Sequence, residues 1–115
     1  MPTHHHFDHI ELVATDMAAA KAFYGAAFGW KFKDWGDDYA DILEAGVAGG
    51  ILHTEKPPIR GEVLAIIYSK DLEATEQAIK AAGGTVGTHH EFPGGRRFQF
   101  QDPSGNELAV WTKTS

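Results

Sequence analysis

The side chains of this chain that could do chemistry are histidines and carboxylates near predicted strands. The chain has no cysteine, so disulfides and thiolate chemistry are excluded, and any metal would need His, Asp or Glu ligands. His9 and Glu11 lie two residues apart in an alternating segment and therefore share one face of a predicted strand. Together with His53 and Glu107, they could hold a divalent metal or orient an organic ligand through hydrogen bonds. A plainer alternative for His9 is a hydrogen bond to a neighbouring carboxylate such as Glu11 or Glu107.

Four further polar residues gather in the second half of the chain. Arg96 and Arg97 follow a Gly-Gly turn, where they could hold an anionic group at the mouth of a cavity or could simply face solvent. His89 and His90 are neighbours in a predicted strand, so at most one of them faces inward. We expect both histidines to be exposed.

Composition narrows the possible classes of protein. The 115 residues are 43% apolar, which is enough for one folded domain with its own core. No apolar run approaches the roughly 18 residues that a membrane span needs, so we expect a soluble, cytoplasmic protein and no membrane partner. The net charge is −6, and no basic stripe is present, which argues against a nucleic-acid partner. Acidic residues concentrate at 34–44, which predicts either a solvated hairpin or a rim that attracts a cationic ligand.

The elements that must position these side chains occur twice. Residues 9–32 align with residues 64–87 at an offset of 55, which matches Asp16 with Asp71 and Gly29 with Gly84. Each copy predicts a strand, an Asp-capped and Ala-rich helix, a glycine stop and a second strand. We therefore expect a single domain over residues 1–115, made of two modules at about 7–54 and 62–113 and joined by a linker at 55–61.

Alternation and turn chemistry predict the remaining strands. The first module is expected to have strands at 7–14, 30–35, 38–43 and 49–54, and the second at 62–69, 85–91, 97–101 and 107–112. Each module thus has the order βαβββ, and the fold class is α+β.

The chain resembles the vicinal-oxygen-chelate superfamily, which comprises glyoxalases, bleomycin-resistance proteins and dioxygenases. The residues that carry the resemblance lie in the segments HIEL at 9–12, FYGAAFGW at 23–30 and DPSGNELAVW at 102–111, and the match extends over about residues 7–112. The resemblance implies paired βαβββ modules whose curled mixed sheets form half-barrels around a cavity, with the helices on the outer face. In many members a divalent metal binds there through His or Glu side chains from the first and last strands of each module.

The metal positions implied by the resemblance are mostly apolar here. The first is His9, and its match in the second module is Leu64. Aligning residues 49–54 with 107–112 assigns the other two positions to Ile51 and Ala109. One histidine cannot hold a metal at useful affinity, because such sites need at least three converging donors. The displaced set of His9, Glu11, His53 and Glu107 would lie about 6–7 Å too far along the strands, unless the register changes.

The sequence therefore predicts a metal-free small-molecule binder that uses the cavity between the modules and needs no cofactor. Its apolar and aromatic wall and its orienting polar groups are expected to be His9, Glu11, Ile51, His53, Leu64, Ile66, Tyr68, Glu107, Ala109 and Trp111. The resemblance adds the expectation of a homodimer. One alternative is a metal-dependent lyase, isomerase or dioxygenase using Zn, Ni, Mn or Fe, with His9 as one ligand. Another is an assembly module whose side chains fill the cavity.

Overall fold

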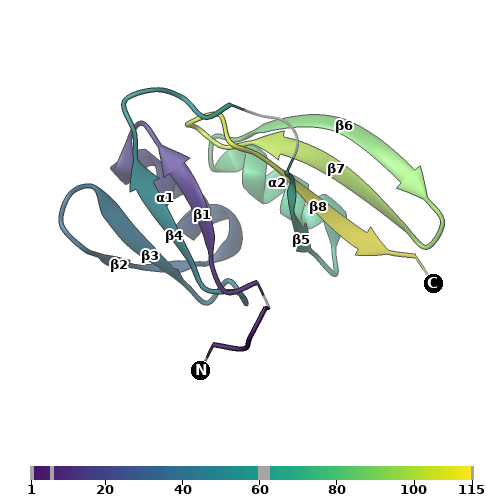
Figure 1. Ribbon diagram of the computed structural model, residues 1–115. Helices are drawn as coiled ribbons and strands as arrows, with labels where there is room; N and C mark the ends of the chain where they lie inside the picture. Colours follow the sequence, from purple (N-terminus) through teal and green to yellow (C-terminus); the bar gives the residue numbers. More distant parts are fainter. Residues whose placement is uncertain (1, 6, 60–62, 115) are drawn as a thin grey trace.

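The first module is a four-stranded sheet with one helix, followed along the chain by a second module of the same plan (Figure 1). The computed structural model describes residues 2–5, 7–59 and 63–114. The first module consists of β1 (Ile10–Ala14), α1 (Met17–Phe28), β2 (Lys31–Asp34), β3 (Tyr39–Leu43) and β4 (Gly49–His53). Its strands lie in the order β1-β4-β3-β2.

The second module repeats this arrangement. It consists of β5 (Ala65–Tyr68), α2 (Leu72–Ala81), β6 (Thr85–Phe92), β7 (Gly95–Gln101) and β8 (Glu107–Lys113), in the sheet order β5-β8-β7-β6. The first strand of each module runs parallel to the last, and the other pairs are antiparallel. The predicted α+β class with two βαβββ modules is confirmed, and the two sheets do not close into a barrel.

The first strand of each module is shorter than the sequence predicts. β1 begins at Ile10 rather than at residue 7, because its pairing with β4 begins at the pair Ile10 and Gly49. β5 covers Ala65–Tyr68 rather than 62–69, and its ladder with β8 has four pairs. Residue 62, and residues 60–61 of the predicted linker, lie outside the described residues.

Both helices begin at the predicted aspartates. The Asp16 carboxylate accepts a hydrogen bond from the Ala19 amide at 3.0 Å, and Asp71 accepts one from the Ala74 amide at 3.1 Å. The helix ends differ: α1 ends at Gly29, which is left-handed with φ 74°, whereas the left-handed residue after α2 is Gly83 with φ 100°. The offset of 55 therefore fails at this point, because α2 has 10 residues and α1 has 12.

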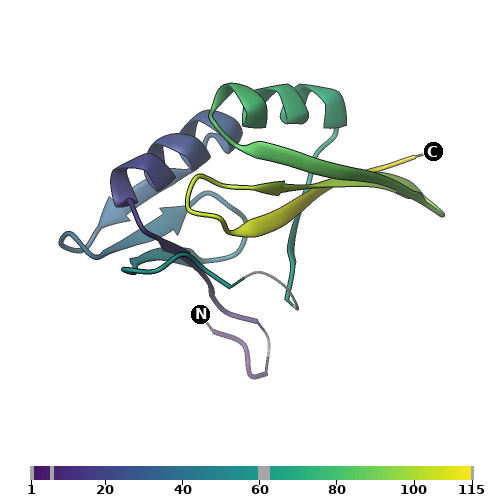
Figure 2. The same cartoon turned by 90° about the horizontal axis from the view of Figure 1, so that it is seen from above.

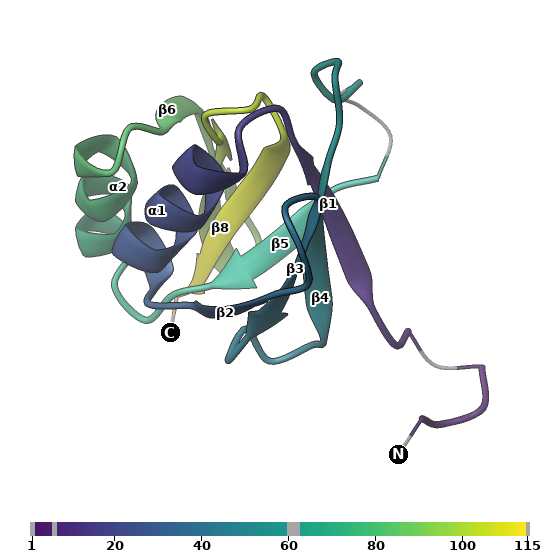
Figure 3. The same cartoon turned by 90° about the vertical axis from the view of Figure 1, so that its left-hand side faces the viewer.

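The helices lie on one side of the sheets and pack against each other (Figures 2 and 3). The core beneath them joins the modules, because Phe23 of α1 contacts Phe100 of β7 with ring centroids 6.1 Å apart. Tyr24 stacks on Trp30 with ring centroids 5.1 Å apart, and Phe23 and Trp30 both belong to this core. Within the described residues, neither helix is long and apolar enough to cross a membrane.

The turn between β7 and β8 fastens the two modules together. Asp102 is buried, and its Oδ1 accepts hydrogen bonds from the amides of Ser104, Gly105 and Asn106, each at 2.9 Å. Its Oδ2 accepts one from the Tyr24 hydroxyl at 2.8 Å, and the Asn106 side chain also donates to Oδ2. Burial, with the Asp102 carboxylate beside it, raises the pKa of the Tyr24 hydroxyl. The DPSGN segment is therefore a structural junction.

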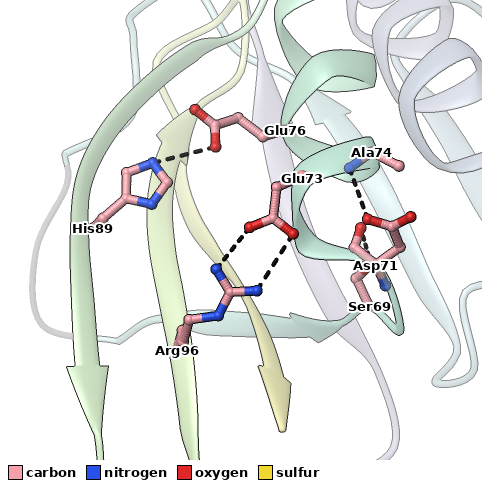
Figure 4. Close-up of polar contacts among 7 residues, drawn as sticks. All are labelled: Ser69, Asp71, Glu73, Ala74, Glu76, His89 and Arg96. Carbon is pink, nitrogen blue, oxygen red and sulfur yellow. Dashed lines mark hydrogen bonds and ion pairs between the residues drawn. The ribbon is translucent and has the colours of Figure 1, made fainter. Parts of the chain in front are cut away.

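Polar side-chain contacts also connect helix α2 to its own sheet (Figure 4). Arg96 of β7 donates to both carboxylate oxygens of Glu73, at 2.6 and 3.3 Å, and His89 lies 3.3 Å from Glu76. The hydrogen bonds from Arg96 lower the pKa of the Glu73 carboxyl, and the same bonds raise the pKa of Arg96. Arg96 is thus engaged within the chain. His89 and His90 are exposed, as predicted.

Candidate functional site

The register of the first sheet decides which of the predicted site residues share a face. Leu12 pairs with Ile51 in the β1–β4 ladder, and both contact the core. In the second sheet Ala65 pairs with Leu108, as Ile10 pairs with Gly49 in the first. The residue that matches Ala109 is therefore Gly50, and the predicted match with Ile51 is wrong by one residue. β4 begins with two glycines, so its first residues show no alternation of apolar side chains that would predict the register of the strand.

Ile51 and His53 lie on the opposite sheet face from Glu11. Ile51 is 1% exposed in the core, and His53 pairs with Ala14, another core residue. The His53 Nδ1 lies 3.6 Å from Asp38 Oδ1 at the end of the sheet. These two predicted site residues are therefore not brought together with Glu11.

His9 is hydrogen-bonded to a residue that sequence reasoning missed. The His9 Nε2 and the Tyr39 hydroxyl are hydrogen-bonded at 2.8 Å, whereas the plainer alternative for His9 was a bond to a carboxylate. Desolvation and the nearby Glu11 carboxylate raise the pKa of Tyr39. The ring of Tyr39 lies over Gly50, where any Cβ would collide with it. Gly50, a glycine inside a predicted strand, was the signal in the sequence that another group approaches the backbone closely.

The remaining predicted residues lie around the second sheet. Tyr68 and Trp111 are paired across β5 and β8, and their rings meet edge to face with centroids 5.1 Å apart. Ile66 pairs with Ala109, which is completely buried, while Leu64 lies just before β5 and is half-buried. Ile66, Tyr68, Ala109 and Trp111 therefore form one patch on β5 and β8, and the two aromatic rings lie at one end of it.

Glu107 lies on the same face of β8 as Ala109 and Trp111, at the start of the strand. It lines a small cavity of about 240 Å³ with polar neighbours from β6 and β7, among them Thr85, Gln99 and Gln101. The cavity adjoins the irregularity of β6 between Val86 and His89. Glu107 is therefore not brought together with His9 in the chain.

The larger cavity lies between the two modules and has a volume of about 490 Å³. Its walls come from the core face of the first sheet, the end of α1, the turn after β3 and the edge strand β5. The lining residues are Ile10, Leu12, Phe28, Trp30, Ile42, Glu44, Ala45, Val47, Ala48, Gly49, Ala65, Ile66, Ile67, Tyr68 and Leu108. Of the predicted site residues, Ile66 and Tyr68 are among them. The other lining residues were missed in the sequence because they form this wall only when the two modules pack together.

A family model of the glyoxalase/bleomycin resistance protein/dioxygenase superfamily matches residues 6–110. The chain belongs to this superfamily. No curated protein sequence matches the chain.

Solved structures of similar shape agree with the superfamily fold. FosX, a fosfomycin resistance protein from Listeria monocytogenes solved with Mn(II) and sulfate, has a TM-score of 0.84 at 18% identity, over 97% of this chain and 93% of that one. A glyoxalase-related enzyme from Fulvimarina pelagi has a TM-score of 0.78 at 19% identity, over 95% and 88% of the two chains. A superfamily protein from Burkholderia phytofirmans has 0.77 at 17% identity, over 93% and 98%. At these identities the likeness is one of fold.

The residues of this chain do not fit the metal centre that the superfamily implies. With the register corrected, the four positions hold His9, Gly50, Leu64 and Ala109, so a single side chain offers a donor. The displaced donors do not compensate, since His53 faces the other side of the sheet and Glu107 lines a separate cavity. Among the described residues no three His, Asp or Glu side chains converge on one point.

Proposed function

We propose that this superfamily member binds a small organic molecule in the cavity between its modules without using a metal. The observation that carries the proposal is the cavity itself. Its volume of about 490 Å³ is typical of ligand sites, which usually measure about 300–1,000 Å³ and are mostly apolar. The donor-poor residues at the superfamily's metal positions support binding rather than metal chemistry.

The proposed site differs from the one expected from the sequence. Ile66 and Tyr68 keep their role as a wall, and Phe28 and Trp30 supply a second aromatic wall. His9 and Glu11 stay outside the lining, and His9 is hydrogen-bonded to Tyr39 instead. Apolar burial thus supplies most of the binding free energy in this proposal, at about 25 cal/mol per Å² of apolar surface removed from water.

We also propose that the protein is a homodimer. The unpaired edges of β1 and β5 have no neighbouring strand within the described residues. Ile10, Ile66 and Tyr68 on these edges are 42–48% exposed, although they are large and apolar. A second copy that covers the edges would remove this surface from water and enclose the cavity.

The binding proposal is tested with Nile red, a neutral apolar dye whose emission shifts to the blue in apolar surroundings. We expect saturable binding with one dye per chain. Ala65→Leu adds bulk to the cavity wall and should weaken binding at least tenfold, while Ala22→Leu on the exposed face of α1 leaves it unchanged. Thermal unfolding checks that both variants fold. Equal dye binding by wild type and Ala65→Leu would place the site elsewhere.

A second measurement addresses metal-dependent chemistry. Protein purified without chelator is analysed for bound metal, and Mn, Fe, Ni and Zn are then added in thermal-shift assays. We expect no stoichiometric metal and no shift that depends on His9. A stoichiometric metal that is lost in His9→Ala would overturn the metal-free proposal in favour of a lyase, isomerase or dioxygenase.

A further inference from the structure

The inter-module cavity has one charged side chain in an otherwise apolar lining. Glu44 supplies a carboxylate, and the Tyr68 hydroxyl and the Trp30 indole N–H are neutral. None of the fifteen lining residues, all of which the structure describes, is Lys, Arg or His. A ligand in this cavity therefore meets negative charge at one point and apolar surface elsewhere.

Glu44 is also available to a ligand. The ion pairs among the described residues use other carboxylates, those of Asp34, Asp38, Glu73 and Glu76. Glu44 is exposed at the end of β3, where the chain turns toward β4. Its carboxylate can therefore approach a bound cation without breaking a contact with a basic side chain.

The backbone at Glu44 is unusual. Its φ is 65°, in the left-handed region that costs a residue with a side chain about 1–2 kcal/mol. Gly46, two residues later, has φ 93°, and this conformation costs little free energy because glycine has no Cβ. This tight turn is part of the cavity wall, and it fixes Glu44 at the cavity. Strained non-glycine residues of this kind occur preferentially at ligand sites.

The surroundings reinforce the preference for a cation. Residues 1–55 carry nine acidic residues and three lysines, and several of the acidic residues lie on the β2–β3 hairpin that leads to Glu44. A charge beside an apolar wall is screened less than one in open water. The rings of Phe28, Trp30 and Tyr68 in the lining can add cation–π attraction.

We infer that the ligand class of this cavity is apolar amines, with the Glu44 carboxylate receiving the protonated nitrogen and the hydrocarbon part filling the cavity. The inference rests on the proposed function, since it names the ligand class of the same site. Apolar carboxylic acids are excluded by the same charge. Apolar alcohols bind more weakly than the amines because they lack the ion pair.

The test compares three probes that differ only in their head group: octylamine, 1-octanol and octanoate. Each probe displaces Nile red from the wild-type protein at pH 7. We expect octylamine to bind at least tenfold more tightly than 1-octanol, and octanoate to bind more weakly than both. The preference for the amine should shrink at high salt, because the carboxylate is partly exposed.

Variants of the acidic residues decide the role of Glu44. Glu44→Gln should bring the affinity for octylamine to within about twofold of that for 1-octanol. Asp37→Asn removes a charge from the same hairpin outside the lining and should lower the preference far less than Glu44→Gln does. An unchanged preference in Glu44→Gln, or equal wild-type affinities for amine and alcohol, would overturn the inference but leave the binding proposal standing. If neither Nile red nor any probe binds, the proposed function itself fails.

Discussion

At the scale of single residues, Asp102 contributes most to the junction between the modules. Asp102→Ala would leave the Tyr24 hydroxyl and the backbone amides of Ser104 and Asn106 without their acceptor, while the Gly105 amide keeps its bond to the backbone carbonyl of residue 102. Buried donors without partners cost about 1–3 kcal/mol each. We expect the free energy of unfolding to fall by about 3 kcal/mol or more, as measured by urea denaturation.

A milder variant keeps this prediction testable if Asp102→Ala does not fold. Tyr24→Phe removes the hydroxyl and leaves Asp102 with its other partners, so we expect a loss of about 1–2 kcal/mol. The ring keeps its stacking on Trp30. A cost below 0.5 kcal/mol, within the range of ordinary surface substitutions, would show that the junction does not depend on this bond.

Which side chains share a face of one strand was easier to predict from the sequence than which residues of other strands they contact. Tyr68 and Trp111 were expected in the same cavity wall, and the pairing of β5 with β8 brings their rings together. Alternation could not find Tyr39 beside His9, because that contact depends on how β3 pairs with β4. The one-residue error at Ile51 has the same origin, since a strand's register is set by its neighbour.

At the scale of elements, the pair between Glu73 and Arg96 connects α2 to β7 (Figure 4). The pKa of Glu73 is lowered in the folded protein from its ordinary value of 4.5. The pair therefore contributes stability that is fully present above about pH 4.5 and is lost as the pH falls through the lowered folded-state value.

A double-mutant cycle with Glu73→Gln and Arg96→Gln measures this contribution. We expect a small favourable coupling free energy at pH 7, because the pair is exposed, and its disappearance at pH 2. Thermal unfolding at both pH values gives the two numbers. The pair of Glu76 and Lys80 gives a comparison within α2, with His89, the second partner of Glu76, left unchanged in every variant. A coupling that persists at pH 2 would contradict the assignment to the Glu73 carboxylate.

The order of the elements was predictable because its signals are local. Asp16 and Asp71 begin the helices through bonds to amides three residues later. The ends of the elements were less predictable. β1 is three residues shorter than expected because residues 7–9 have no ladder partner, and α2 ends earlier than α1 although their sequences align.

At the scale of the whole molecule, the position of the cavity depends on packing between modules. The sequence predicted a cavity on the face that carries His9. The structure has its larger cavity on the core face of the first sheet, against the edge of β5. Contacts between Phe23, Tyr24 and the second module set this geometry. No periodicity within one module reports on such contacts, so the lining from Phe28, Trp30 and Glu44 could not be read from the chain.

The open edges of the two sheets give the last prediction, which concerns the assembly. Ile10 is 42% exposed on the edge of β1, and Ile59 in the loop after β4 is 99% exposed. We expect light scattering after size exclusion to give twice the mass of the chain at micromolar concentration. Ile10→Asp places a charge on the covered edge and should weaken the dimer at least tenfold, because burying an unpaired charge is costly. Ile59→Asp should leave it unchanged. A wild-type protein that stays monomeric at 100 µM would contradict the homodimer, and the cavity would then bind its ligand with the edge of β5 open to solvent.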